Sequence, residues 1–545
     1  MNPHAPRIRD AGDSALLIEW DEAIDPAINA RAIATAVAIR GADLPGLRDV
    51  VSTYRSVAVF FDPLTVDPDT LRAPLAQLSD EPRPIAPGKT IEIPVTYGGE
   101  GGPDLAGVAE WAGLSADGVV ERHSATDYRV FMLGFLPGFG YLGSVEATIA
   151  APRRGTPRVR VPAGSVGIAG RQTGIYPRES PGGWQLIGRT AVKVFDTSRT
   201  QPALFAPGDI VRFRPVSPSE AVPSNDAQRA STTRIENASR AIAVIRPGLF
   251  TTIQDRGRWG HQASAVPVSG AMDLVSHRVA NLLVGNGDDA ATLEVTLAGP
   301  ELRIEQETCV AIAGADLQAS VDGAATPIGV ATRCRRGSVL RFGERRSGTR
   351  AYIAFDGGLD VPLMCGSRAT HVGAAIGGLD GRALATGDRL PLGSSRGDHP
   401  SRSIGARAIP SGGARLRILP GPQDEFFAEP AFTLLERTRF VVTPQSNRMG
   451  YRLSGASIPR TSDREMISDA TFVGAIQVPT SGEPILLMSD RQTTGGYPQM
   501  ATVITADLPL AGQLAPGDWV EFARCTRTEA IAALRDQEAM LGGLT

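Results

Sequence analysis

The chain has 545 residues, of which 42% are hydrophobic and 21% are charged, a composition typical of folded globular proteins rather than disordered ones. At roughly 150 residues per domain, this length predicts two to four domains. The 55 basic and 58 acidic residues give a net charge of -3, which argues against a nucleic acid or an anionic membrane as the partner and favours a small molecule or another protein.

Targeting segments and cysteine chemistry are not indicated. The first ten residues, MNPHAPRIRD, lack the charged-then-apolar profile of a signal peptide, and no stretch approaches the roughly 20 consecutive apolar residues of a transmembrane helix. We therefore expect a cytoplasmic protein. The four cysteines form no CxxC pair, and His261 and His371 lack metal-ligand spacing, so we expect neither a disulfide framework nor a zinc site, and the sequence leaves any other metal requirement open.

Local patterns divide the chain into segments. Residues 1–85 read as a small α+β domain, because apolar residues at 27–40 have helical spacing and those at 57–61 form a short buried-strand run. After the proline-rich stretch EPRPIAPG, residues 86–215 contain short β-like runs with one helical pattern at 105–112. Residues 216–240 are polar and without period, as in a linker. The β-like, glycine-rich texture returns over 241–545, with a helix predicted at 528–540.

Three sequence blocks occur twice, in the same order. They are VP at 161–162 and 478–479, RQTGIYP at 171–177 and RQTTGGYP at 491–498, and APGDIVRF at 206–213 and APGDWVEF at 515–522. The last pair agrees at six of eight positions. We interpret the chain as two copies of one β-rich fold, and we expect Tyr176 and Tyr497 to be equivalent. Two related barrels could pack about a pseudo-twofold axis and leave a ligand site between them.

Lysine-dependent chemistry can be checked directly, because Lys89 and Lys193 are the only lysines in the sequence. The GKT at 88–90 does not complete a phosphate-binding loop, since Arg83 occupies the position of the first glycine. Lys193 lies in VKV, which alternates like a strand and is not the methionine-flanked turn of a biotin carrier. We therefore expect no covalent biotin on this chain.

The first half of the chain carries a set of long motifs. They are YGGEGGPD at 97–104, GFLPGFGYL at 134–142, QTGIYP at 172–177 and PGGWQLIGRT at 181–190. These motifs resemble the B subunit of bacterial 5-oxoprolinase, also called the KipI family or allophanate hydrolase subunit 1.

The second half carries a different set. It comprises TIQDRGR at 252–258, SGAMD at 269–273, SNRMGYR at 446–452, GAIQVP at 474–479 and DRQTTGGYP at 490–498. This set resembles the C subunit of the same enzyme, the KipA family.

The resemblance implies a natural fusion of two subunits, each built on a cyclophilin-like β-barrel, with a small α+β domain leading the first. It implies a component of the ATP-dependent 5-oxoprolinase, which opens 5-oxoproline to L-glutamate together with a separate A subunit. The same pair of modules resembles the carboxyltransferase part of urea carboxylase, in the urea amidolyase family. Two alternatives stay open: a biotin-dependent carboxyltransferase acting on urea or a related amide, and a Kip-type regulatory pair that inhibits a histidine kinase.

Opening a lactam is easier once ATP has phosphorylated the carbonyl oxygen, and the phosphate charge then needs a cationic clamp. The sequence leaves open whether ATP binds here or, with magnesium, on a partner protein. The catalytic candidates are His123 in the first half and Arg448, Asp490 and Arg491 in the motifs of the second half. The substrate-binding candidates are Gln172, Tyr176, Arg189, Asp255, Arg256, Arg258, Gln492 and Tyr497. The structural alternatives are that the Asp-Arg pairs brace turns and that His123 braces a helix-to-strand junction.

Overall fold

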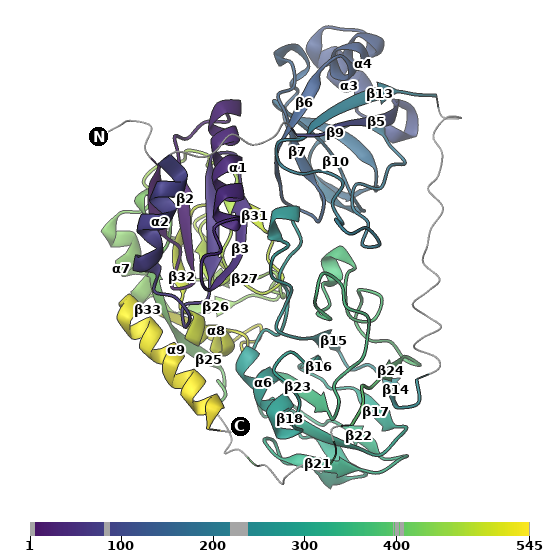
Figure 1. The fold of residues 1–545 in the computed structure, drawn as a ribbon, viewed down its shortest axis with the longest axis vertical. Coiled ribbons are helices and arrows are strands. Elements are labelled where there is room, and N and C mark those ends of the chain that lie inside the picture. The colour runs from purple at the N-terminus through teal and green to yellow at the C-terminus, as the bar shows by residue number, and fades with distance from the viewer. Residues whose placement is uncertain are drawn as a thin grey trace.

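The computed structural model describes residues 6–80, 88–217, 238–395, 397, 403 and 408–543. These residues form four units: an N-terminal α+β domain, a first β-barrel, a pair of β-sheets, and a second β-barrel (Figure 1). The predicted fold class, two barrel modules with a small N-terminal α+β domain, is therefore confirmed. Most of the linker predicted over 216–240 lies outside the described residues.

The N-terminal domain is a four-stranded antiparallel sheet in the order β1-β2-β4-β3, with two helices. Its elements are β1 (Arg7–Asp10), β2 (Ala15–Glu19), α1 (Pro26–Arg40), β3 (Leu47–Ser52), β4 (Ser56–Phe61) and α2 (Pro68–Asp80). The Asp25 carboxylate accepts hydrogen bonds from the N–H groups of Ala27 and Ile28 and so caps α1, the predicted first helix.

Strand β4 is buried on both faces, which explains its unbroken apolar run. Val57 and Val59 point into the core formed with the domain's own helices. Ala58 and Phe60, on the opposite face, pack into a cluster with residues of the second barrel, among them Phe472. The N-terminal sheet is thus sandwiched between its helices and the second barrel (Figure 1).

Within residues 88–217, nine strands form the first module, and seven of them close a barrel in the order β10-β7-β6-β13-β5-β12-β9. The strands are β5 (Thr90–Tyr97), β6 (Asp127–Leu133), β7 (Gly140–Gly143), β8 (Arg158–Val161), β9 (Ser165–Ala169), β10 (Gln172–Ile175), β11 (Ser180–Gly182), β12 (Gln185–Arg189) and β13 (Ile210–Pro215). Helices α3 (Leu105–Ala112) and α4 (Ala116–Ser124) connect β5 to β6, and α3 confirms the predicted helix.

Within residues 408–543, nine strands again form a module with a seven-stranded closed barrel. The strands are β25 (Gly413–Pro420), β26 (Phe440–Val442), β27 (Gly450–Ser454), β28 (Asp469–Ala470), β29 (Ala475–Gln477), β30 (Ile485–Leu487), β31 (Thr494–Gly495), β32 (Gln499–Val503) and β33 (Trp519–Arg524), and the helices are α7 (Glu429–Arg437), α8 (Leu508–Ala511) and α9 (Arg527–Gly542). Helix α9 contains the helix predicted at 528–540.

The two modules have the same topology, strand for strand. Substituting β25–β33 for β5–β13 in chain order reproduces each pairing, including the one parallel pair, β13 with β5 and β33 with β25. The APGD blocks mark equivalent turns into the last strand. The Asp209 carboxylate accepts a hydrogen bond from Ala206 N–H at 2.8 Å, and Asp518 accepts one from Ala515 N–H at 2.9 Å.

The other two repeated blocks are offset by one strand. Gln172 begins barrel strand β10, whereas Gln492 lies in the loop between β30 and β31. The first VP block ends β8, and the second follows β29. Tyr176 is buried, whereas Tyr497 is 47% exposed. The expected equivalence of Tyr176 and Tyr497 is therefore wrong, because short motifs of turn-forming residues recur beside different strands of the same fold.

The segment between the barrels differs from the single barrel module predicted over 241–545. Residues 238–395 form two sheets, β20-β19-β22-β17-β14-β24 and β15-β16-β23-β18-β21, which share one apolar core. The elements are β14 (Ala241–Arg246), β15 (Phe250–Gln254), α6 (Leu274–Leu283), β16 (Thr292–Thr296), β17 (Glu301–Ile304), β18 (Thr308–Asp316), β19 (Ser320–Val321), β20 (Ala324–Ala325), β21 (Ala331–Cys334), β22 (Val339–Arg341), β23 (Ser347–Phe355) and β24 (Arg389–Pro391). Short glycine-rich strands occur in β-sandwiches as well as in β-barrels, so this sequence pattern could not distinguish the two folds.

Two smaller findings complete the fold. No helix in the described part of the chain combines the length and the apolar character needed to span a bilayer. The strand suggested around Lys193 is absent. Residues 191–193 form an irregular segment, and the Lys193 carbonyl accepts a hydrogen bond from the Arg199 side chain at 2.9 Å.

Candidate active site between the two barrels

The two barrels touch at Gly134, in the loop between β6 and β7, and Thr494, on β31. A Cβ placed on Gly134 would lie 2.0 Å from the Thr494 Oγ1 atom and 3.1 Å from the Tyr141 ring. A side chain at residue 134 would force Thr494 or the adjoining backbone to shift, so glycine suits this close approach of the two barrels. Figure 1 shows β31 at the edge of the second barrel nearest the first.

An aromatic cluster from three units supports the contact. The ring of Tyr54, from the N-terminal domain, lies 5.4 Å from that of Phe131 and 6.1 Å from that of Tyr141, between ring centroids. Ile467 of the second module packs against the same cluster. Gln172 belongs to this support, since its amide donates a 2.5 Å hydrogen bond to the Tyr54 hydroxyl.

A pocket of about 280 Å³ opens in the second barrel beside Thr494. Its walls are rich in amide and hydroxyl side chains: Gln445, Asn447, Thr471, Gln477, Gln492 and Thr494. Such groups both donate and accept hydrogen bonds, as the recognition of a neutral amide requires. Of the predicted residues, Gln492 lies in this pocket, whereas Tyr497 does not line it.

A second pocket, of about 230 Å³, lies in the first barrel and has a different character. Five aromatic side chains and two arginines line it: Phe135, Phe139, Tyr141, Tyr176, Trp184, Arg153 and Arg154. Burial raises the pKa of Tyr141 and of Tyr176 to about 12, so both hydroxyls stay protonated at neutral pH. Tyr141 lines this pocket and also flanks Gly134, so the contact between the barrels borders both pockets, which we call the interbarrel pockets.

The loop after β30 is fixed by a buried ion-pair network rather than by solvent-facing charges. Arg448 donates to both carboxylate oxygens of Asp490, at 2.9 and 3.1 Å, and also binds Glu294. Burial alone would lower the pKa of Arg448, but these carboxylates raise it. Burial would raise the pKa of Asp490, but the Arg448 guanidinium lowers it. Both members of the pair are charged and buried, and the pair fixes the segment that carries Gln492 and Thr494.

Arg491 is turned away from this pocket. It is 3% exposed, and its Nη2 donates to Gln262 at 2.9 Å while its Nε donates to the Thr471 carbonyl at 3.3 Å. Burial lowers the pKa of Arg491 to about 10. Arg491 lines a separate cavity, bounded by the N-terminal domain, the sandwich, the second barrel and α9.

The DRGR segment supports loops of the sandwich and contributes nothing to the walls of either interbarrel pocket. The Asp255 carboxylate accepts hydrogen bonds from Ser367 at 2.7 Å and from the N–H groups of Gly257 and Arg368. Arg258 is buried against the carbonyls of Met364 and Ala369. Arg256 lines the same cavity as Arg491.

The remaining candidates of the first module are not brought together. His123 is fully buried, with its ring nitrogens bonded to the hydroxyls of Tyr97 at 2.8 Å and Thr173 at 2.9 Å, and burial lowers its pKa to about 3. This geometry favours the bracing interpretation. Arg189 is exposed and bonds to the Ala163 carbonyl at 3.0 Å.

Several pocket residues were not among the predicted site residues. Tyr141, Gln477 and Thr494 lie inside motifs that carried the family resemblance, so the sequence contained a signal that could have identified them. Arg153 and Arg154 lie outside those motifs, and only the folded structure identifies them as pocket residues. In the described part of the chain, no group of three or more His, Cys, Asp or Glu side chains is placed to hold a metal ion.

Comparisons with known proteins agree with the two-module architecture. The family model "Carboxyltransferase domain, subdomain C and D" matches residues 6–205, and "Carboxyltransferase domain, subdomain A and B" matches residues 264–524. The 5-oxoprolinase C subunit of Escherichia coli (strain K12) is 40% identical over 299 residues, which cover 54% of this chain and 95% of that protein. The 5-oxoprolinase B subunit of Bacillus subtilis (strain 168) is 40% identical over 225 residues, covering 39% of this chain and 93% of that protein.

A solved structure has the same architecture. The crystal structure of TTHA0988 superposes with a TM-score of 0.83 at 37% identity, covering 95% of this chain and all of that one. The chain therefore belongs to the family formed by the B and C subunits of 5-oxoprolinase, with homologues of both joined in one polypeptide.

Proposed function

We propose that this chain is the B/C component of an ATP-dependent 5-oxoprolinase, which opens 5-oxoproline to L-glutamate together with a separate protein of the A-subunit type. The observation that carries the proposal is the joining of a B-subunit homologue and a C-subunit homologue through a contact, Gly134 with Thr494, that borders one pocket from each barrel. In this proposal the lactam binds in the pocket of the second barrel, beside the contact between Gly134 and Thr494.

The two pockets offer complementary chemistry. The lactam ring of 5-oxoproline presents one N–H donor and one carbonyl acceptor, and the side-chain amides of Gln477 and Gln492 can match both. Its carboxylate can face Arg452, which lines the same pocket. Arg153 is exposed and has no carboxylate partner among the residues that the structure describes, so its guanidinium can face negative charge. Phosphorylation of the lactam oxygen by ATP gives water a better electrophile, and Arg153 stabilises the charge that develops.

The predicted catalytic residues take indirect roles in this proposal. Arg448 and Asp490 are positioning residues, because they fix the loop that carries Gln492 and Thr494. His123 holds α4 against the barrel. We assign ATP to the A-type partner protein, and equilibrium dialysis of ATP against each protein alone checks that assignment.

The test is release of ADP and glutamate from 5-oxoproline by the full chain mixed with an A-subunit homologue. We expect turnover only with both proteins and ATP present. Arg153→Met should lower kcat by about 10²–10³-fold, as for loss of one electrostatic donor. Arg212→Met is the matched control, since Arg212 is also exposed in the first barrel but is held by Asp127 at 2.6 and 2.8 Å. Absence of glutamate under all conditions would contradict the proposal.

A biotin-dependent carboxyltransferase is the second candidate, favoured by the descriptions of the two matching family models. In that case the amide pocket would hold the acceptor and a carboxybiotin on another polypeptide would supply the carboxyl group. Carboxylation of urea that requires a biotin carrier protein, with no ADP-linked glutamate release, would select this candidate over the first.

A further inference from the structure

A third cavity lies away from both interbarrel pockets. It has a volume of about 400 Å³ and is bounded by the N-terminal domain, the sandwich, the second barrel and helix α9. Figure 1 shows α6, α8 and α9 close together at this junction. None of its lining residues lines either interbarrel pocket, so a ligand here would not occupy the proposed lactam site.

Arg491 brings a buried positive charge to the wall of this cavity, and within the described residues no carboxylate contacts it directly. Its two hydrogen-bond acceptors, the Gln262 side chain and the Thr471 carbonyl, are both neutral. Within the described residues, no ion pair joins a carboxylate to its guanidinium, and only its Nε and Nη2 have hydrogen-bond acceptors. The charge of Asp49 raises the pKa of Arg491 from farther away, but less than burial lowers it. Asp49 is reached only through Gln262, whose N–H and side-chain amide both donate to it, at 3.1 and 3.3 Å. A buried charge without a counter-ion is costly unless a ligand supplies one.

The other arginines lining the cavity already have carboxylate partners. Arg48 pairs with Asp62 at 2.8 Å, and Arg278 pairs with Asp288 at 2.9 Å. Arg256 lies 3.9 Å from the same Asp288, and its side chain is 46% exposed at the rim. Arg491 is therefore the deep cation that remains available, while Arg256 can attract an anion at the entrance.

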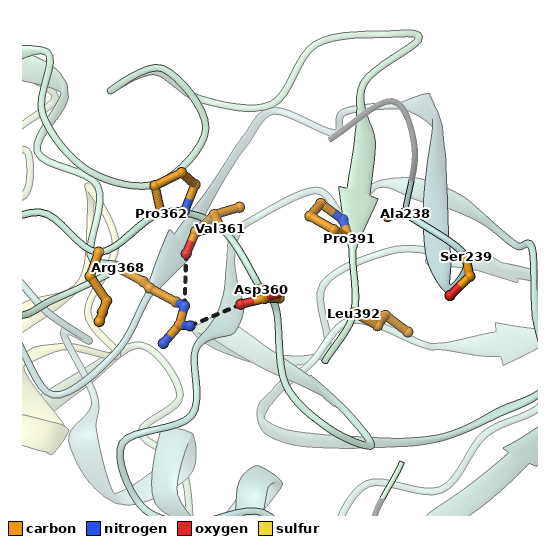
Figure 2. Close-up of a pocket in the computed structure, with 9 residues that line it drawn as sticks. Ala238, Ser239, Asp360, Val361, Pro362, Arg368, Pro391 and Leu392 are labelled. Atoms are coloured by element: carbon orange, nitrogen blue, oxygen red, sulfur yellow. Dashed lines mark hydrogen bonds and ion pairs between the residues drawn. The ribbon is translucent and has the colours of Figure 1, made fainter. Parts of the chain in front are cut away.

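A larger pocket in the sandwich shows the contrast. It has a volume of about 470 Å³, and its arginine, Arg368, donates to Asp360 at 3.0 Å and to the Val361 carbonyl at 2.9 Å (Figure 2). The charge of Arg368 is thus already balanced within the pocket, so that pocket has no comparable need for an anion.

The remaining walls of the junction cavity are mostly apolar and include Met272, Met488 and Leu508. The acidic side chains Asp62 and Glu538 also line it and would oppose a multiply charged anion. We propose that the junction cavity is a second ligand site, which binds a small organic monocarboxylate with its carboxylate on Arg491 and its apolar body against Met272, Met488 and Leu508.

The test uses the full chain and a matched pair of probes, 4-bromobenzoate and its uncharged isostere 4-bromobenzamide. Isothermal titration calorimetry should show that the carboxylate binds at least about tenfold more tightly than the amide. In crystals soaked with 4-bromobenzoate, the anomalous signal of bromine should lie among Met272, Met488 and Leu508. Equal affinities, no binding of either probe, or bromine outside the cavity would overturn the proposal.

Three variants sharpen the result. Arg491→Met removes the charge but keeps an unbranched side chain, and it should weaken 4-bromobenzoate at least about tenfold. Arg256→Glu reverses charge at the exposed rim without disturbing the buried wall, and it should weaken binding by a smaller, salt-dependent factor. If Arg491→Met does not fold, the Arg256→Glu variant supplies the test, because an unchanged affinity for 4-bromobenzoate in that variant would overturn the proposal. Gln492→Ala, at the next residue but facing the interbarrel pocket, should leave the affinity unchanged. No readout involves turnover, so this test is independent of the proposed enzymatic activity.

Discussion

The two barrels share their topology strand for strand, yet they differ in the polar groups that stabilise them. In the first, a neutral buried histidine, His123, joins Tyr97 and Thr173 by hydrogen bonds. In the second, a buried ion pair between Arg448 and Asp490 ties the barrel to the sandwich through Glu294. The pockets also differ: five aromatic side chains and two arginines line one, whereas the other is lined mostly by amides and hydroxyls, with one arginine, Arg452. A duplicated fold thus fixes where the pockets lie, while side chains decide what each can bind.

The largest effect should come from breaking the charged network. Arg448→Met leaves Asp490 buried without its ion-pair partner and leaves Glu294 with only Arg350, at 3.7 Å, so it should cost about 3–5 kcal/mol of unfolding free energy. Urea denaturation followed by circular dichroism measures the change. Arg452→Met, at an exposed arginine on β27, is the control and should stay within about 0.5 kcal/mol of the original chain. A cost below about 1 kcal/mol for Arg448→Met would show that the network is not a structural necessity.

The next prediction tests the offset of the repeated blocks. Tyr176 is buried among Phe135, Phe139 and Trp184, so Tyr176→Ala should cost about 3 kcal/mol. Tyr497, 47% exposed, should tolerate alanine within about 0.5 kcal/mol. Thermal unfolding of both variants gives the comparison, and equal losses would contradict the difference in burial between the two tyrosines.

A smaller effect should appear as a pH dependence that belongs to the first barrel. The pKa of His123 is lowered by burial from 6.5 to about 3 in the folded state, so the unfolded chain takes up its proton first and stability falls as pH drops below 6.5. Between pH 7 and pH 5, His123 should account for about 2 kcal/mol of lost stability. His123→Gln should lose that much less over the same interval in urea titrations. Parallel pH profiles for the two proteins would contradict the neutral, buried imidazole.

Much of the fold could be predicted from local patterns. The apolar run of β4, the spacing in α1 and the APGD turns all report on neighbours close in sequence. The placement of the N-terminal sheet against the second barrel could not be predicted in this way. It depends on Ala58 and Phe60 meeting Phe472, which is distant in the chain, and a strand buried on both faces does not reveal which surfaces cover it.

The candidate site was predictable only in part. The motif DRQTTGGYP was correctly singled out, but its consecutive residues serve different places: Asp490 closes an ion pair, Arg491 lines the junction cavity and Gln492 lines the interbarrel pocket. Which way each side chain points is set by contacts with other units, such as that of Arg491 with Gln262. A sequence motif alone does not show how its side chains are oriented.

The close approach of Gly134 to Thr494 is the feature on which a joint site depends. Gly134→Ala would place a methyl group 2.0 Å from the Thr494 Oγ1 atom and force the barrels apart, whereas Gly107→Ala, in helix α3 with open space around it, is the matched control. The decisive measurement is glutamate release from 5-oxoproline by each variant mixed with an A-subunit homologue. We predict a loss of about 10²-fold for Gly134→Ala, as expected for a misplacement of about 1 Å, and full turnover for Gly107→Ala. Full turnover by a folded Gly134→Ala protein would contradict a site shared by the two barrels.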